Sequence, residues 1–286
     1  MQTSTKQKSN PKIYRPAVSV IIPCYNQAQY LKECLDSVMN QTFQDFEVIV
    51  VDDGSTSPDS KKTFKALNYP KTRIIRQKNE GPMQARNHGI SLAKSKYIYP
   101  LDADDKISPV TLEKSVKILN ENPDGGIVGG RTELFGAKSG LFKLPPDHFP
   151  EILGGNRLVC SCMFRRADWE KVGGYNPNMK YGLEDYDFWL SLIEMGRKVY
   201  QFDDVFLYYR QSEISRTTKM KMEKNKQMLE QIVKNHPKLY QQHPFYKMIL
   251  LDDWVIKIIR RLVKILCLVT PVKSWRRKLR NLYRKG

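Results

Sequence analysis

Two hydrophobic periods alternate along the first hundred residues. The run VSVIIP (18–23) is continuously apolar and β-branched, which is typical of a strand buried on both faces, and residues 28–39 repeat apolar positions at helical spacing. The alternation continues through EVIVV (47–51), a helix around 61–67, RII (73–75), a helix over about 83–93 and YIYPL (97–101). This order predicts an α/β fold with a parallel sheet, right-handed crossovers and helices on both faces.

The next hundred residues carry shorter elements. Residues 108–122 are expected to form a helix, with Ser108 as N-cap and Pro109 at the first helical position. The segments IVGG and LVCSCMF (158–164) indicate further strands, and a short helix, a Gly-Gly-Tyr turn and a helix that begins near Glu184 follow them. The α/β domain is therefore expected to extend to about residue 218.

The pattern changes beyond Tyr209. Residues 219–243 are polar, Lys- and Gln-rich and helix-favouring, and residues 245–269 place seven apolar side chains on one helical stripe that Pro271 ends. The chain thus divides into a disordered basic lead-in (1–16), the α/β domain (17–218) and a helical, basic, amphipathic C-terminal extension (219–286).

Charge separates these parts more sharply than composition does. Hydrophobic residues at 41% and charged residues at 27% are ordinary globular values, which excludes collagen and wholesale disorder. The 48 Lys and Arg against 30 Asp and Glu give a formal net charge of +18; residues 219–286 hold 18 basic and 4 acidic residues, or +14, which leaves +4 for the rest. An anionic partner is expected for the extension.

Cysteine spacing and apolar runs bear on location. The five cysteines include no CxxC pair, so neither a zinc site nor a secreted disulfide framework is indicated, and Cys160 and Cys162 are expected to be buried thiols. The N-terminus has no apolar signal region, and no apolar run reaches about 18 residues. We expect a cytoplasmic protein, either soluble or peripheral on the cytoplasmic face of a membrane.

The strongest chemical signal is LDADD (101–105), directly after an apolar strand. Ligands of parallel α/β sheets bind at the carboxyl ends of the strands. Carboxylates at Asp102 and Asp104 could hold a divalent cation that already carries a diphosphate, because Mg²⁺ and Mn²⁺ prefer oxygen ligands. The alternative is a solvated acidic turn that caps the next helix.

Three other segments have both a functional and a plain interpretation. Asp53 in VDDGST could accept hydrogen bonds from a base or sugar, or belong to a simple Asp-Gly turn, and Tyr25 could stack on a base or only pack at a strand end. Arg86 in NEGPMQARNHG could contact a diphosphate or pair with a surface carboxylate. In GLEDYDFWL, Glu184 and Asp185 could supply a general base or merely cap a helix.

In this order, the motifs PCYN, VDDGST, NEGPMQARNHG, LDADD, GGYN and LEDYDFWL resemble the family 2 glycosyltransferases, over about residues 18–210. The resemblance implies a GT-A fold with a mostly parallel, Rossmann-like sheet. It also implies an inverting transfer of sugar from a nucleotide-diphosphate donor, expected to be a UDP-sugar, to a hydroxyl of a glycan or lipid-linked acceptor in polysaccharide biosynthesis.

The resemblance assigns roles residue by residue. Asp185 would be the catalytic base with Glu184 supporting it, and Asp104 would coordinate Mn²⁺ or Mg²⁺ while Asp102 meets the ribose or the metal shell. Tyr25 would stack on the nucleobase, Asp53 would hydrogen-bond it and Arg86 would support the nucleotide and metal. The substrate-binding set also includes Pro23, Asn26, Asn79 and Arg210.

Two departures from the family pattern refine the expectation. The family often has a His two residues after a Tyr-Arg pair, but Ser212 follows Tyr209 and Arg210 here, so water or Arg216 would complete the metal site or the contact is weaker. No QxxRW sequence is present, which favours a non-processive hexosyltransferase.

The extension allows several interpretations. Residues 245–286 could lie on an anionic membrane surface with Trp254 and Trp275 near the headgroups, or the stripe could pack on the catalytic domain. Nucleic acid is not expected as a partner, because aromatic residues are sparse in the basic run and no recognition motif accompanies it. A non-catalytic nucleotide-sugar-binding protein and nucleic-acid binding through the basic tail are the two alternatives to the glycosyltransferase function.

Overall fold

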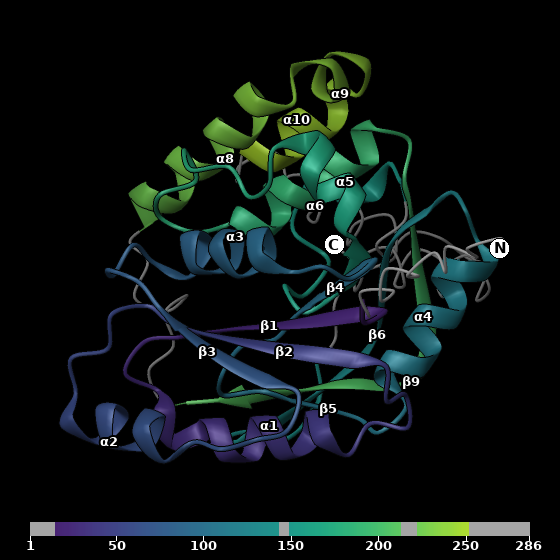
Figure 1. Ribbon diagram of the computed structural model, residues 1–286. Coiled ribbons are helices and arrows are strands. Elements are labelled where there is room, and N and C mark those ends of the chain that lie inside the picture. The colour runs from purple at the N-terminus through teal and green to yellow at the C-terminus, as the bar shows by residue number, and fades with distance from the viewer. Residues whose placement is uncertain (1–14, 143–148, 213–221, 252–286) are drawn as a thin grey trace, which may run out of the picture.

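The computed structural model describes residues 15–142, 149–212 and 222–251, and a single mixed sheet runs through the centre of this part (Figure 1). The strand order is β3-β2-β1-β4-β8-β6-β9-β5, with β7 paired to β6. The strands are β1 (Val18–Cys24), β2 (Phe46–Asp52), β3 (Thr72–Arg76), β4 (Tyr97–Pro100), β5 (Lys106–Ile107), β6 (Gly125–Gly136), β7 (Gly140–Leu141), β8 (Met163–Arg165) and β9 (Lys198–Gln211).

The first four strands form the predicted parallel sheet. Strand β1 pairs in parallel with both β2 and β4, and β2 pairs in parallel with β3. All seven residues of β1 are buried, as its continuous apolar run predicts. Beyond β4 the sheet becomes mixed, because β8 runs antiparallel to β4 and β6 while β6 and β9 are parallel.

Helices cover both faces of the parallel strands, which confirms the predicted α/β architecture (Figure 1). One face carries the 3₁₀ helix η1 (Ala28–Tyr30), α1 (Leu31–Met39) and α2 (Pro58–Ala66), and the other carries α3 (Pro82–Leu92), α5 (Arg166–Val172) and α6 (Glu184–Glu194). Helix α3 approaches β1 closely at Gly89, where a Cβ would lie 2.6 Å from Cγ2 of Ile21. Helix α4 (Thr111–Glu121) contacts β6 and β9.

Helix α4 begins later than the sequence indicates. The predicted N-cap Ser108 and first residue Pro109 lie in a turn, and the N-cap is Val110. The Pro109 carbonyl accepts the Thr42 N–H at 2.8 Å, and the Ser108 carbonyl accepts Nε2 of Gln41 at 2.7 Å. These bonds to the α1–β2 connection hold both residues outside the helix.

The strand predicted over residues 158–164 is largely wrong. Only Met163–Arg165 pairs with the sheet, at two register positions of β4 and two of β6. The preceding residues Leu158, Val159 and Cys160 line a cavity instead. The alternating apolar side chains of this segment therefore reflect burial in a loop.

Three C-terminal helices pack on the α6 side of the molecule: α8 (Met222–Asn235), α9 (Pro237–Gln242) and α10 (Pro244–Leu251) (Figure 1). Buried His236 joins them to α6, with Nε2 at 3.3 Å from Oδ1 of Asp187 and Nδ1 at 3.0 Å from Oε2 of Glu194. The predicted helical character of 219–243 is confirmed for its described part. Only the first residues of the 245–269 stripe are described, and in the described ranges no helix is both long and apolar enough to cross a membrane.

Candidate active site

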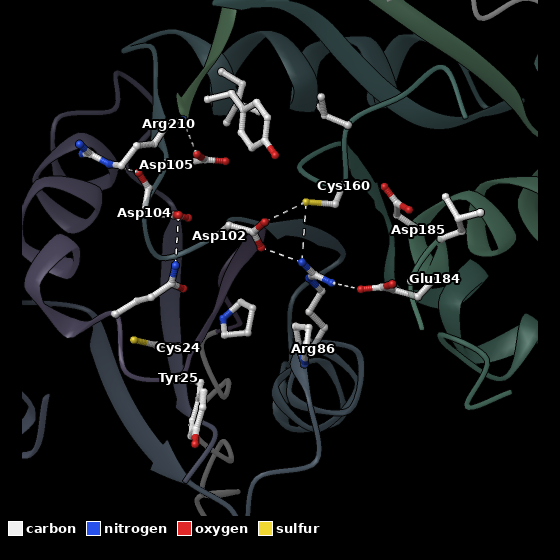
Figure 2. A pocket seen from close by; sticks show the side chains of 18 of the residues that line it. Cys24, Tyr25, Arg86, Asp102, Asp104, Asp105, Cys160, Glu184, Asp185 and Arg210 are labelled. Atoms are coloured by element: carbon white, nitrogen blue, oxygen red, sulfur yellow. Dashed lines mark hydrogen bonds and ion pairs between the residues drawn. The ribbon is translucent and has the colours of Figure 1, made fainter. Parts of the chain in front are cut away.

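A cavity of about 640 Å³ lies at the carboxyl ends of the parallel strands (Figure 2). Nine of the eleven predicted site residues line it, which brings together segments more than 180 residues apart: Pro23, Tyr25, Asp53, Arg86, Asp102, Asp104, Glu184, Asp185 and Arg210. The register of the sheet explains why Tyr25 and Asp53 lie near each other, because Cys24 at the end of β1 pairs with Asp52 at the end of β2. The residues that follow both strands therefore meet at one edge.

The two other predicted residues, Asn26 and Asn79, do not line the cavity. Asn26 adopts a left-handed backbone, with φ of 53°, and its Oδ1 accepts the N–H groups of Thr56 and Ser57 at 2.9 Å each. It thereby ties the loop after β1 to the loop after β2. Asn79 is exposed, and its backbone passes so close to Gly54 that a Cβ there would lie 2.7 Å from the Asn79 nitrogen.

Asp53 and Tyr25 both line the cavity. Asp53 is buried and already accepts three hydrogen bonds, from Nε2 of Gln77 at 2.8 Å and from the backbone N–H groups of Glu80 and Gly81 at 3.0 and 2.9 Å. These contacts hold the loop after β3 against the cavity. Tyr25 is 44% exposed, so its side chain is accessible to a flat ligand.

The acidic loop after β4 concentrates negative charge. Burial, reinforced by Asp102, raises the pKa of Asp104 to about 6. Burial and the two neighbouring carboxylates also raise the pKa of Asp105 well above its ordinary value. Asp105 Oδ1 accepts the Arg210 backbone N–H at 2.8 Å, and Asp104 Oδ2 accepts Nε2 of Gln27 at 3.2 Å. A loop that crowds carboxylates in this way favours a bound cation.

Arg86 connects the acidic loop to helix α6 and lies between the two in Figure 2. Its guanidinium is buried and places Nη2 2.6 Å from Oδ1 of Asp102 and Nη1 3.3 Å from Oε1 of Glu184. The thiol of Cys160 donates to Oδ2 of Asp102 across 3.4 Å. Arg86 is therefore a buried residue with two ion pairs, and the alternative that it is a surface arginine is wrong. Glu184 pairs with Arg86, so it does more than cap the start of α6.

Asp185 lies one residue further along α6 and faces the same cavity. Burial, followed by repulsion from Glu184, raises the pKa of Asp185 to about 6. Its Oδ1 accepts the Tyr186 N–H at 2.8 Å and its Oδ2 accepts Nδ2 of Asn156 at 3.1 Å. A carboxylate with this pKa can accept a proton near neutral pH.

Arg210 of β9 holds the acidic loop through hydrogen bonds to Asp104 and Asp105. Its Nε donates to the Asp104 carbonyl at 2.8 Å, and its guanidinium pairs with Glu33 and lies 4.3 Å from the centre of the Phe135 ring. Ser212, which stands where the family often has a His, lines the cavity, and Arg216 lies outside the described residues.

The donor set fits a divalent cation only in part. Among the described residues no group of three or more His, Cys, Asp or Glu side chains is arranged to hold a metal ion. Asp102 and Asp104 nevertheless offer hard oxygen donors at the cavity wall, and Mg²⁺ is commonly bound by one or two carboxylates that are completed by phosphates and water. The residues present therefore suit an ion that arrives with a diphosphate.

Sequence reasoning missed several cavity residues. Asn156 and Gln27, which donate to Asp185 and Asp104, belong to no recognised motif. The prediction of two buried thiols is confirmed for Cys162, whereas Cys160 is only half-buried, and its place beside Arg86 and Asp102 follows only from the loop that replaces the predicted strand. Tyr181, four residues before Asp185, lines the cavity and could have been suspected from its position just ahead of the acidic helix start.

Comparison with known proteins identifies the class. The family model for glycosyl transferase family 2 matches residues 19–166, and this chain belongs to that family. An uncharacterized glycosyltransferase of Rickettsia felis is 33% identical over 205 residues, which is 67% of this chain and 34% of that protein. The hyaluronan synthase of Pasteurella multocida is 32% identical over 199 residues, 64% of this chain and 19% of that enzyme. The chain thus spans about a third or less of either relative.

Solved structures support the same fold. TarS residues 1–349 of S. aureus, in complex with UDP-GlcNAc, aligns with a TM-score of 0.64 at 19% identity, over 90% of this chain and 77% of that one. The mannosyltransferase PcManGT of Pyrobaculum calidifontis, in complex with GDP-Man and Mn²⁺, aligns with a TM-score of 0.57 at 19% identity, over 96% and 84% of the two chains. The predicted GT-A type fold is confirmed.

Proposed function

We propose that this protein is an inverting glycosyltransferase that moves a hexose from a nucleotide-diphosphate donor, with a UDP-sugar as the expected donor, to a hydroxyl of a glycan or lipid-linked acceptor. The observation that carries the proposal is the shared cavity, in which the acidic loop and Asp185 face one ligand-sized space. Family membership and the nucleotide-sugars bound by TarS and PcManGT support it.

The two sides of the cavity suit different parts of a donor. Tyr25 and Asp53 would receive the base, and Asp102 and Asp104 would hold Mn²⁺ or Mg²⁺, since all four line the cavity. When bound, the ion would neutralise the charge that develops on the departing diphosphate. Arg86 keeps Asp102 and α6 at a fixed separation through its two ion pairs.

Asp185 would take the proton from the acceptor hydroxyl as that oxygen attacks the anomeric carbon from the face opposite the diphosphate. Attack from that side inverts the anomeric configuration. The neighbouring hydrogen bonds from Asn156 and Tyr186 keep the carboxylate oriented while it does so. We propose single or few additions rather than polymerisation, because the sequence has no QxxRW motif.

The substitution Asp185→Asn tests the assignment. It keeps the shape of the side chain but removes the proton acceptor, so we expect transfer to fall by about 10²–10⁴-fold while donor affinity is unchanged. The transfer rate is measured as release of nucleoside diphosphate from UDP- and GDP-sugars in the presence of a panel of oligosaccharide acceptors. Donor affinity is measured by calorimetry with Mn²⁺. Turnover of Asp185→Asn at the wild-type rate would refute the assignment of Asp185 as the base. Donor binding without turnover in the wild-type chain would favour the non-catalytic alternative.

We further propose that residues 245–286 meet an anionic membrane surface. Phe245 and Met248 of α10 are 51% and 42% exposed, and residues 252–286 contain 11 basic and 2 acidic residues, a net charge of +9. A truncation after residue 251 keeps α8–α10 and should abolish flotation with phosphatidylserine vesicles, whereas the full chain should float in a salt-sensitive way. Flotation of the truncated chain at the full-length level would refute this role.

A further inference from the structure

Asn156 contacts Asp185 although no motif marks it. Its Nδ2 donates to Oδ2 of Asp185 at 3.1 Å, and its Oδ1 accepts the backbone N–H of Leu158 at 3.3 Å. Because the Leu158 N–H can only donate, it must face the amide oxygen, and the amide nitrogen is therefore turned toward Asp185. The local turn thus decides which end of this amide reaches the carboxylate.

Both oxygens of Asp185 are held in this way. Oδ1 accepts the N–H of Tyr186 at 2.8 Å, which comes from the same helix, while the Asn156 amide comes from a separate segment. Each carboxylate oxygen can accept two hydrogen bonds, so a position remains open on each for a substrate hydroxyl. The carboxylate is oriented without being saturated.

The segment that carries Asn156, residues 151–156, here called the strap, is itself attached to α6 and α9. The hydroxyl of Tyr186 donates to the Ile152 carbonyl at 2.8 Å, and the hydroxyl of Tyr240 donates to the Leu153 carbonyl at 3.1 Å. Helix α10 packs so closely that a Cβ on Gly154 would lie 3.4 Å from Ile249 and Tyr246 side-chain atoms. Helix α6 and the strap are therefore linked at two points: Tyr186 of α6 bonds Ile152 of the strap, and Asn156 of the strap bonds Asp185 of α6.

We propose that Asn156 is a positioning residue that holds the carboxylate of Asp185 toward the acceptor hydroxyl, and that the strap and the C-terminal helices α9 and α10 keep it there. The proposal deepens the function proposed above and rests on Asp185 as the base. It gives the described part of the C-terminal extension a task in the chemistry, because Tyr240 of α9 holds the strap. No covalent step is added, since the proton still passes from acceptor oxygen to Asp185.

The geometry makes a titration prediction. Burial and Glu184 raise the pKa of Asp185, and the Tyr186 N–H, the Asn156 amide and Arg86 of α3 oppose that rise. The thiol of Cys160 and the phenol of Tyr175 also interact electrostatically with Asp185, and burial raises the pKa values of both. Removing the Asn156 donor therefore leaves the carboxylate anion less stabilised, and the pKa of Asp185 should rise.

The full-length substitution Asn156→Asp is the sharpest test. It keeps the shape and the acceptor for the Leu158 N–H, but places a carboxylate oxygen where the amide donated. We expect the pKa of Asp185 to rise by about one unit or more, measured by ¹³C NMR of Asp-labelled protein with the Asp185→Asn spectrum as assignment. Asn156→Ala should also raise it, by about one unit or less, and the acid limb of kcat should move to higher pH with it.

Asn235→Ala is the matched control. Asn235 of α8 donates to Oδ1 of Asp187 of α6 at 2.5 Å. This variant therefore also loses an Asn–Asp hydrogen bond to α6, but the bond is not made to Asp185. It should lower the thermal midpoint and leave the pKa of Asp185 and the kcat profile unchanged. Rescue of the profile in Asn156→Ser, whose hydroxyl can donate, would support positioning.

The outcomes separate this inference from the proposed function. An unchanged Asp185 pKa in both Asn156→Asp and Asn156→Ala would overturn the positioning role, even if Asp185→Asn were inactive. A raised pKa together with a fully active Asp185→Asn would uphold the contact but remove the base that it is proposed to position, and the inference would fall with the proposed function.

Discussion

The two walls of the cavity are built in different ways. The strand-end wall, made of Tyr25, Asp53, Asp102 and Asp104, consists of loops that directly follow adjacent parallel strands. The helix wall, made of Asn156, Glu184 and Asp185, consists of a loop and a helix start that are joined by side-chain hydrogen bonds and anchored by the C-terminal helices. Backbone pairing in the sheet positions the first wall, and side-chain packing positions the second.

The difference indicates where each wall is vulnerable. The strand-end wall is supported by the ladder between β1 and its two neighbours, so a single side-chain change there should affect binding more than stability. The helix wall relies on a few polar contacts across long sequence separations, such as the ion pair between Arg86 and Glu184. Changes to those contacts should disturb orientation and folding together.

The largest effect should come from Arg86→Met, which breaks the link between the walls. Loss of this buried cation leaves Asp102 and Glu184 without their shared partner, and we expect the free energy of unfolding to fall by about 3–5 kcal/mol. Denaturant unfolding followed by circular dichroism measures it. Arg86→Lys keeps the charge without the fork and should lose less, whereas a loss below about 1 kcal/mol in Arg86→Met would mean that the walls are held independently.

A smaller and more selective effect should come from Asp104→Asn in the strand-end wall. One of two carboxylates at the proposed cation site is removed, so Mn²⁺-dependent donor affinity should fall about tenfold or more, while the pH midpoint of kcat is unchanged. Calorimetric titration of UDP-sugar with and without Mn²⁺ measures the first quantity. Asp59→Asn on α2 is a carboxylate control outside the cavity, and equal donor affinity in both variants would contradict the assignment.

The smallest expected effect is the pH dependence of kcat in the unmodified protein, which tests the helix wall. Burial and Glu184 raise the pKa of Asp185 to about 6, and a base acts only when deprotonated. At saturating donor and metal, kcat should therefore rise with pH through about 6 and fall about tenfold per unit below it. Asp185→Glu should be slower but keep an acid limb, and a flat wild-type profile between pH 5 and pH 7 would show that another group accepts the proton.

Much of the strand-end wall could be predicted because its signals are local. The apolar runs before Tyr25, Asp53 and Asp102 identify strands, and parallel strands place their carboxyl ends at one edge. Asn26 and Asn79 also belong to the motifs but do not line the cavity: Asn26 bonds the loop after β2 and Asn79 is exposed, because the direction of a loop side chain depends on the turn it occupies.

Much of the helix wall could not be predicted. The alternation in residues 158–164 indicates a strand, yet β4 pairs with β8 at only two positions and leaves Leu158–Cys162 in a cavity-lining loop. A sequence window records that a side chain is buried, and it does not record whether a strand or a cavity covers it.

The sequence alone determined the order of strands and helices from β1 to β4, the acidic loop, the acidic start of α6 and the family, because each depends on residues that are neighbours in the chain. Only the tertiary structure decided that Arg86 joins Asp102 to Glu184, that Asn156 holds Asp185, and that α9 and α10 secure the strap. Those contacts join residues that lie 16 to 98 positions apart, and such pairs are selected by the packing of the whole domain.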